Sequence, residues 1–434
     1  MQSDLTESVQ ASIRPGEMID TYYCGETNLE KQAYPSVVNT RFVQQFTNLG
    51  AGSSQFIISP QQGVSDIILQ FAMPVAGAGG STAYTSLALS DGWGYSLINR
   101  ISVRYGSSAQ YFWSGAQVLL QNWLDAENNP KMEALLKQGG SFTTPDSLQT
   151  ATTGAPIVAN VYLKLPHNSC RAAGKPLPFA SDLLVQPIVI TVEMVNPQSI
   201  FIVQSGGGVL TNGPTSLASA QLQVKQEMLT DTSDLLARRV DMNSHAYTFP
   251  LPYFCQQETQ VQLGTPGLGQ LQSVNLTGFR AGEVKNIVLW LTKNTEQGPS
   301  TISNGYYPFK WYPLSQVTLT YNGEVFSRFD SSSGQLWNLV SETKSSSLND
   351  VVLATAGSAP GTFTKNVSYW LDCPFAQVNI PAERDMKLFH GKPILNAVVN
   401  LSFIAPTNDA YTLHAMYLYN ASLLCSRGSA EYIF

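Results

Sequence analysis

The sequence predicts an all-β protein built from two tandem β-sandwiches, with short helices in long loops. Three observations predict it: short apolar runs are separated by turn residues, helical periodicity is scarce, and the two halves repeat one another in the same order. Charged residues make up only 12% of the 434 residues, against about 25% in ordinary soluble domains. A composition of this kind favours strands, turns and broad protein–protein contacts over long solvated helices.

The strand signals are runs of β-branched and aromatic residues bounded by Gly, Pro, Asn and Ser. They include residues 63–71, 101–105, 186–192 and 317–321. Pro187 stands at the start of its run, where no donor of the strand ladder is lost. Helical spacing predicts helices over 114–127 and 130–137, and a short one near Asp4 and Glu7, which resemble an N-terminal capping box.

Four matches relate the two halves, with sequence shifts between 216 and 220 residues. They pair 64–69 with 284–289, 101–106 with 317–322, Ser114-Gly115 with Ser333-Gly334, and 174–177 with 391–394. Their common order indicates a duplication and divides the chain into an N-terminal arm (1–40) and two modules (41–235 and 236–434). Each module has about 200 residues, which suits an eight-stranded jelly roll of two four-stranded sheets. The predicted fold is therefore a tandem double jelly roll.

Charge and cysteine usage argue against several functions. The net charge is −6, and Lys and Arg are scattered singly apart from Arg238-Arg239, so the concentrated basic face of a nucleic-acid binder is missing. The five cysteines are far apart and never form a Cys-x-x-Cys pair, which predicts neither a zinc knuckle nor a disulfide framework. The N-terminus lacks a signal-peptide pattern, and no apolar run approaches the roughly 20 residues that span a bilayer. We expect synthesis in the cytosol or nucleus, and we interpret the four Asn-x-Ser/Thr sequons, at Asn275, Asn366, Asn400 and Asn420, as chance matches.

No motif predicts catalysis. His167, His245, His390 and His414 lack metal-ligand spacing, and His167 lies near Cys170 without an orienting carboxylate. We expect His414 to be a polar residue on a half-exposed strand. Several segments resemble binding loops but lack an essential feature, namely 77–81, 174–176 and 206–208 for phosphate and 231–234 for calcium. The densest charge cluster, 383–385, is interpreted as a solvated loop with an internal ion pair. Four aromatic residues favour a core or subunit contact over a sugar groove: Trp93, Tyr95, Trp311 and Tyr312. We therefore expect no enzyme activity, no cofactor and no metal site.

Residues 161–166 and 174–179, followed by Leu184 and residues 186–190, together resemble a recurring stretch of double jelly-roll major capsid proteins. In that family a strand leads through a loop and a Leu-Pro-apolar step, here Leu177-Pro178-Phe179, into a strand of the same sandwich. A weaker version occurs at 370–374 and 391–394. These proteins coat tailless icosahedral double-stranded DNA viruses, a lineage that includes tailless membrane-containing bacteriophages and adenovirus-like viruses.

The resemblance implies a homotrimer that forms a pseudo-hexagonal capsomer and tiles an icosahedral shell in the virion. Neighbouring capsomers, penton and minor capsid proteins and an internal membrane are the implied partners, without sequence-specific nucleic-acid binding. The arm at 1–40 is similar in position to arms that run beneath such capsomers. Two alternatives stay open, a minor capsid or spike protein of the same virus class and a two-sandwich carbohydrate-binding or carbohydrate-hydrolysing protein.

Overall fold

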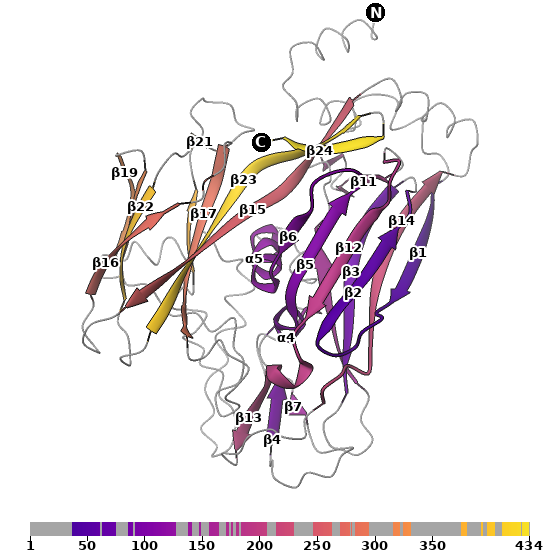
Figure 1. Cartoon of the computed structure of the whole chain (residues 1–434), viewed down its shortest axis with the longest axis horizontal. Coiled ribbons are helices and arrows are strands. Elements are labelled where there is room, and N and C mark those ends of the chain that lie inside the picture. The colour runs from indigo at the N-terminus through magenta and orange to yellow at the C-terminus, as the bar shows by residue number, and fades with distance from the viewer. Residues whose placement is uncertain are drawn as a thin grey trace, which may run out of the picture.

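Strands dominate the computed structural model of the chain, and they form two sandwiches side by side (Figure 1). The structure describes residues 37–60, 63–74, 86–89, 92–126, 138–140, 147–148, 156–164, 171–172, 175–176, 179–181, 184–205, 214–229, 246–262, 270–277, 279, 283–294, 316–321, 324–330, 375–379, 392–393, 397–403, 410–426 and 428–433. The predicted all-β class is confirmed. Among the described residues, no helix combines the length and hydropathy needed to cross a membrane.

The first sandwich consists of two antiparallel sheets. Sheet I has the order β1 (Val37–Gln45), β14 (Ser219–Leu229), β3 (Gly63–Met73), β8 (Ile157–Leu163), with the short β11 (Phe179–Ala180) also beside β3. Sheet II has the order β2 (Gly52–Ile58), β12 (Ile188–Met194), β5 (Ile98–Tyr105), β6 (Tyr111–Trp113). Numbered along the chain, its eight main strands run 1-8-3-6 and 2-7-4-5 across the two sheets. This is the strand order of a jelly roll.

The second sandwich repeats this order strand for strand. Sheet III has the order β15 (Ala246–Gln262), β23 (Ala410–Ser426), β17 (Glu283–Lys293), β20 (Phe375–Asn379), with β21 (Lys392–Pro393) beside β17 and β24 (Ser429–Ile433) beside β23. Sheet IV has the order β16 (Gln270–Leu276), β22 (Ala397–Phe403), β18 (Gln316–Tyr321), β19 (Glu324–Asp330). The tandem double jelly roll is thereby confirmed.

Short strands outside the two sandwiches form β4 (Ser86–Leu89) with β13 (Phe201–Ser205) and β7 (Ser147–Leu148), and β9 (Arg171–Ala172) with β10 (Lys175–Pro176). Strand β1 begins at Val37, inside the segment expected as an arm, and the expected boundary at 235/236 lies outside the described residues.

A shared irregularity supports the duplication at residue level. In sheet I the pairing of β3 with β14 shifts register around Ser65, and in sheet III the pairing of β17 with β23 shifts around Lys285. These two bulge positions are separated by the shift that the match of 64–69 with 284–289 predicts. Such bulges are usually retained features of a fold rather than defects. Strands β5 and β18 also pair with equivalent neighbours, in agreement with the match of 101–106 with 317–322.

The match of 174–177 with 391–394 is wrong in register. Lys392–Pro393 pairs with the start of β17, but Lys175–Pro176 pairs with β9. The segment that pairs with the start of β3 is Phe179–Ala180, four residues further on. A Gly-Lys-Pro string occurs in both modules, near the segment that pairs with the start of β3 or β17. The strand pairing shows that Phe179–Ala180, not Lys175–Pro176, is equivalent to Lys392–Pro393. The Ser333-Gly334 match lies outside the described residues.

The core lies between the paired sheets because inward positions alternate with outward ones along each strand. Burial alternates residue by residue along β12, and the inward residues of β3 are fully buried. Phe46 makes edge-on ring contacts with Phe56 and Phe71, at centroid distances of 4.7 and 5.7 Å. Buried apolar residues of both sandwiches belong to one contiguous cluster.

The helices among the described residues are α4 (Trp93–Ser96), α5 (Gly115–Ala126) and the short 3-10 helix η2 (Pro197–Ile200). Helix α5 confirms the prediction over 114–127. It starts with a capping box: the Gln117 N–H donates to Ser114 Oγ (3.2 Å), and the Ser114 N–H donates to Gln117 Oε1 (2.9 Å). The helices expected over 130–137 and near Asp4 lie outside the described residues.

Replacing Ser114 with alanine is expected to lower the free energy of unfolding by about 1 kcal/mol, because the Gln117 N–H loses its acceptor. Ser114→Asp keeps an acceptor at the same position and should stay within a few tenths of a kcal/mol of the parent. Urea denaturation measures both changes. Equal losses in the two variants would contradict a capping role.

Candidate functional site

The outward face of sheet I carries a row of primary amides that crosses four strands. Gln45 Nε2 donates to Gln221 Oε1 (3.2 Å), and Gln221 Nε2 donates to Gln70 Oε1. Gln70 Nε2 in turn donates to Asn160 Oδ1 (3.0 Å). Two further amides extend the row, since Gln223 donates to Gln70 (3.3 Å) and Asn160 donates to Gln138 (3.3 Å). We call the following residues the amide row: Gln45, Gln70, Gln138, Asn160, Gln221 and Gln223.

Strand periodicity produces this row. On β14, Leu222 and Val224 point into the core and are fully buried, so Gln221 and Gln223 point outward. The ladder places Gln221 opposite Gln70. The alternating Gln-Leu-Gln-Val pattern of residues 221–224 therefore predicts which glutamines point outward. It does not predict their hydrogen-bond partners on the other strands.

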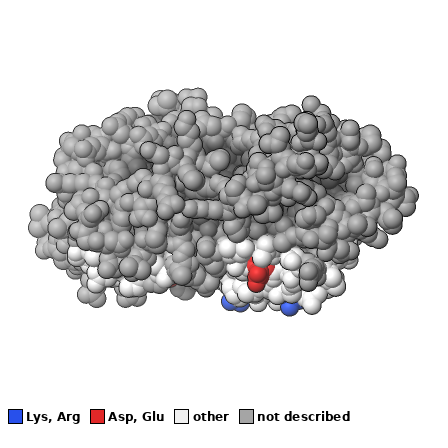
Figure 2. All heavy atoms as spheres, turned by 90° about the horizontal axis from the view of Figure 1, so that it is seen from above, with Lys and Arg blue, Asp and Glu red and all other residues white. Residues whose placement is uncertain are grey.

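Apolar side chains and a few charged ones surround the amides on the same face. Val43 and Val158 are 42% and 50% exposed, and the register places both on the outward side. Asp66 and Lys225 form an ion pair at 4.0 Å, which balances their charges. Figure 2, the view from above, shows both acidic and basic side chains among the uncharged side chains of the described residues. A partner docking on sheet I would meet amides and methyl groups together with the charged residues Arg41, Asp66 and Lys225.

The equivalent row of sheet III has different chemistry and is buried at Trp290. There Glu258 faces His414, and His414 faces Trp290, in the positions of Gln45, Gln221 and Gln70. Trp290 is 1% exposed, and the His414 ring stacks on it at 5.1 Å and 5°. The duplicated modules have thus diverged at this row: Gln70 is half-buried in the first, whereas Trp290 is fully buried in the second and Glu258 stays exposed.

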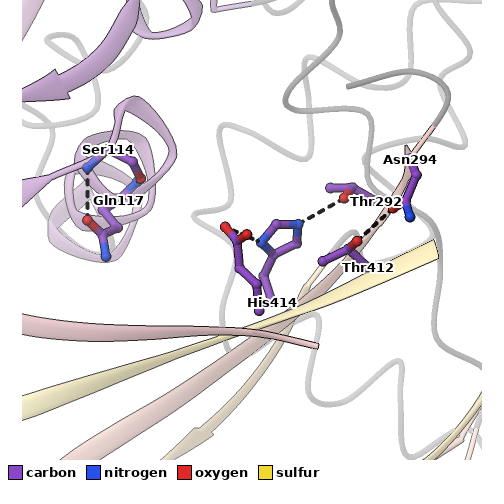
Figure 3. A network of polar contacts seen from close by, with 7 residues as sticks. Ser114, Gln117, Thr292, Asn294, Thr412 and His414 are labelled. Carbon is purple, nitrogen blue, oxygen red and sulfur yellow. Dashed lines mark hydrogen bonds and ion pairs between the residues drawn. The ribbon is translucent and has the colours of Figure 1, made fainter. Parts of the chain in front are cut away.

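His414 joins a polar network whose order resembles a catalytic triad (Figure 3). Its Nε2 lies 2.8 Å from Thr292 Oγ1, and its Nδ1 lies 3.4 Å from Glu258 Oε1. The burial is the reverse of a working triad, in which the hydroxyl meets the substrate and the carboxylate is buried. Here Thr292 is 1% exposed and the Glu258 side chain is 61% exposed. The network is therefore structural.

The His414 side chain is only 13% exposed, so it is more buried than a half-exposed strand position would suggest. Sequence reasoning missed its partners because both come from strands far away in the chain. In the adjacent row, Thr412 Oγ1 donates to Asn294 Oδ1 at 2.6 Å (Figure 3).

A joint between the two sandwiches forms where β24 reaches the first module. The Val185 N–H donates to the Gly428 carbonyl (3.1 Å), and Leu184 forms a parallel bridge with Gly428. The Ala430 N–H donates to Ser107 Oγ (2.9 Å) in the turn after β5. Backbone contacts of this kind fix the position of one module against the other.

Aromatic packing reinforces the joint. The ring centroid of Tyr432 on β24 lies 6.3 Å from that of Tyr111. Ser108 Oγ donates a hydrogen bond to the Tyr432 hydroxyl (3.4 Å). Burial raises the pKa of Tyr105 well above its usual value, and ionisation of Tyr432 or Tyr111 nearby would raise that pKa further. Tyr105 therefore stays neutral at physiological pH.

Gly428→Ala is expected to open the joint at a cost of about 1–2 kcal/mol. Gly428 has a left-handed φ of +81°, and an added Cβ would collide with Val185 Cγ2. Hydrogen exchange of the Val185 amide measures the opening. Val185→Ala alone should have little effect, because the side chain is exposed, and in the Gly428→Ala background it should restore part of the protection. Unchanged protection in Gly428→Ala would contradict the joint.

An open pocket of about 480 Å³ lies beside the start of α5. Arg100 there lies 3.2 Å from Glu193, and its guanidinium carbon lies 5.3 Å from the centre of the Phe112 ring. Asn99 Nδ2 donates to the same carboxylate (2.9 Å). Because Glu193 already balances Arg100, this pocket has no net charge with which to select an ionic ligand.

The structure shows where some of the candidate site residues from the sequence lie. Trp93 and Tyr95 are fully buried, which confirms a core position and excludes them from a sugar groove. Burial raises the pKa of Tyr95, opposed by a hydrogen bond from Asn122. Among the described residues, no three His, Cys, Asp or Glu side chains gather as a metal site would need. The remaining candidates lie outside the described residues: His167, Cys170, His245, His390, Trp311, Tyr312 and segments 77–81, 206–208, 231–234 and 383–385.

Cys425 is a buried free thiol, and burial raises its pKa from 9.0 to about 12. At pH 8 the folded thiol should therefore react with iodoacetamide about a thousandfold more slowly than the urea-unfolded thiol. Above about pH 9 only the unfolded thiol ionises, so this group lowers the free energy of unfolding as pH rises. Mass spectrometry of the alkylated peptide measures the rates, and equal rates in both states would contradict the burial.

Comparison with known proteins identifies the architecture. No protein-family model and no curated protein sequence matches the chain. Among solved structures, VP54 of PBCV-1, fitted into a reconstruction of the virophage Sputnik, is 12% identical with a TM-score of 0.59, covering 92% of this chain and 97% of that one. The mavirus major capsid protein is 11% identical (TM-score 0.54; 92% and 90% covered), and the Faustovirus major capsid protein is 9% identical (0.56; 98% and 98%). All three are double jelly-roll major capsid proteins, and this chain has their fold.

Proposed function

We propose that the chain is the major capsid protein of an icosahedral double-stranded DNA virus, and that three copies form a pseudo-hexagonal capsomer. The observation that carries the proposal is the presence of two equivalent jelly rolls held side by side in one chain. Three such chains present six similar modules around a three-fold axis, and this outline can pack in a hexagonal net. The proposed location is the virion shell, where other capsomers, penton and minor capsid proteins are the neighbours.

The surface chemistry supports an assembly role. Closed symmetric assemblies need extensive complementary surfaces rather than a reactive site. The low charge content and the amide row allow hydrogen-bonded, hydrated contacts without strong repulsion between copies. The structural neighbours, all capsid proteins, point to the same role.

Light scattering on the purified full chain, with electron microscopy of the same fractions, tests the proposal. We expect a species of three times the chain mass of 47.2 kDa, with a near-hexagonal outline. A strict monomer at high concentration that does not assemble when ionic strength is lowered would overturn it. Protein stain of isolated virions separates this function from a minor capsid or spike role, because a major capsid protein dominates the stain.

A further inference from the structure

The open pocket beside the start of α5 is built around a bulge in β5. Across the ladder with β12, Arg100 faces Glu193 and Ile98 faces Met194, so Asn99 is the extra residue. Asn99 and Arg100 are consecutive, yet both are exposed instead of alternating between the two faces of the sheet. Bulges re-aim side chains in this way and are frequent next to functional sites. Here the bulge brings two polar side chains to one pocket.

The polar groups of the pocket keep unused hydrogen-bonding capacity. Arg100 binds one oxygen of the Glu193 carboxylate at 3.2 Å, and Asn99 Nδ2 donates to the other at 2.9 Å. A carboxylate has about four acceptor positions and a guanidinium has about five N–H donors, so both can take further partners. The pocket therefore presents donors and acceptors side by side, with its ion pair balanced.

Two buried side chains that line the pocket carry donors that the chain does not use. Trp113 is 4% exposed, and its indole Nε1 has no hydrogen-bond partner within the part of the chain that the structure describes. Gln117 is 6% exposed, and its Oε1 accepts the Ser114 N–H, while Figure 3 shows its Nε2 on the side away from that bond. A buried donor without an acceptor is costly. These donors point to a ligand that supplies acceptors.

An exposed aromatic ring completes the wall of the pocket. Phe112 on β6 is 46% exposed, and the guanidinium carbon of Arg100 lies 5.3 Å from its ring centre. Ligand sites commonly combine such apolar surface with a few placed polar groups, in volumes of about 300–1,000 Å³. The pocket volume of about 480 Å³ lies in this range. A nucleic acid or an anionic lipid would need net positive charge, which the paired Arg100 does not supply.

We propose that this pocket binds a neutral sugar unit of a glycan. A sugar ring offers a C–H face to Phe112, and its neighbouring hydroxyls each donate and accept, as the Asn99, Arg100 and Glu193 groups require. The joint between the modules uses the turn after β5, so the pocket lies at the other end of that strand. The inference does not depend on the capsid role, because a chain of any assembly state can carry the site.

Fluorine NMR of the full chain labelled with 5-fluorotryptophan tests the site directly. Trp113→Phe identifies the Trp113 resonance among those of the seven tryptophans. The probes are four neutral disaccharides (lactose, maltose, cellobiose and α-linked mannobiose), with sialyllactose as the anionic comparison. We expect a neutral disaccharide to shift the Trp113 resonance in a saturable way, and sialyllactose to bind no better than lactose.

Arg100→Ala and Arg104→Ala form a matched pair of variants. Both arginines are exposed residues of β5, but Arg100 lines the pocket and Arg104 does not. Loss of the charged donor in Arg100→Ala should weaken disaccharide binding about tenfold or more, whereas Arg104→Ala should change it by less than about twofold. Phe112→Leu should also weaken binding, and Phe112→Tyr should retain it because the ring remains. Circular dichroism melting identifies any variant that fails to fold.

A Trp113 resonance that no neutral disaccharide shifts would overturn the site, as would equal losses in the two arginine variants. Binding of sialyllactose alone would overturn the neutral class of ligand. Each of these results would leave the capsid role standing, since light scattering measures assembly separately. A strictly monomeric chain that binds a neutral disaccharide would overturn the capsid role and support the site.

Discussion

Replacing Gly115 with alanine is expected to lower the free energy of unfolding by about 3 kcal/mol, the upper end of ordinary overpacking costs. Helix propensity alone predicts the opposite sign, since alanine in a helix is about 1 kcal/mol better than glycine. Geometry opposes this preference: a Cβ on Gly115 would collide with the Tyr95 carbonyl oxygen and lie 2.7 Å from the Ile98 carbonyl oxygen. Both are backbone atoms, so no side-chain rotation can relieve the contact.

Ala116→Gly provides the matched control at the next position of α5. It removes a methyl group without creating a collision, and it should cost about 1 kcal/mol through helix propensity. Urea denaturation monitored by circular dichroism measures both variants, as a change in midpoint at constant slope. Stability of Gly115→Ala equal to or above that of the parent would mean that α5 does not begin against the Tyr95–Ile98 backbone.

Local signals explain why so much of the fold was predictable. The alternating or continuous apolar runs mark β3, β5, β12, β17 and β18. Ser114 and Gln117 stand three residues apart at the start of α5, and this spacing alone indicates the capping box. The duplication followed from collinear matches, and the bulges at Ser65 and Lys285 preserve the shift that the first match predicts.

The long-range contacts could not be predicted in the same way. Gly428 and Val185 meet across the joint, yet neither has a neighbouring residue that marks it as a contact. The Gly-Lys-Pro match failed for the same reason, because strand pairing rather than local similarity decides which segment lies beside β3. The amide row needs the register of four strands at once, and a single sequence does not contain that register.

Trp290→Ala should destabilise the chain by about 3–5 kcal/mol, because it empties a fully covered aromatic site and removes the ring on which His414 stacks. Its neighbours Ile287 to Leu291 form a continuous apolar run and are buried on both faces of β17, as such runs usually are. Trp290→Phe keeps an aromatic ring and should lose about half as much or less. Chemical denaturation measures both.

The decisive control is Gln70→Ala, which changes the equivalent position of the first module. Gln70 is half-buried and its amide bonds compete with water, so the loss should be about 1 kcal/mol in the isolated chain. Gln70→Ala and Trp290→Ala change equivalent positions of the two modules. Their losses in the free energy of unfolding should nevertheless differ several-fold, because Trp290 is buried within the chain and Gln70 is only half-buried. Equal costs would contradict this difference.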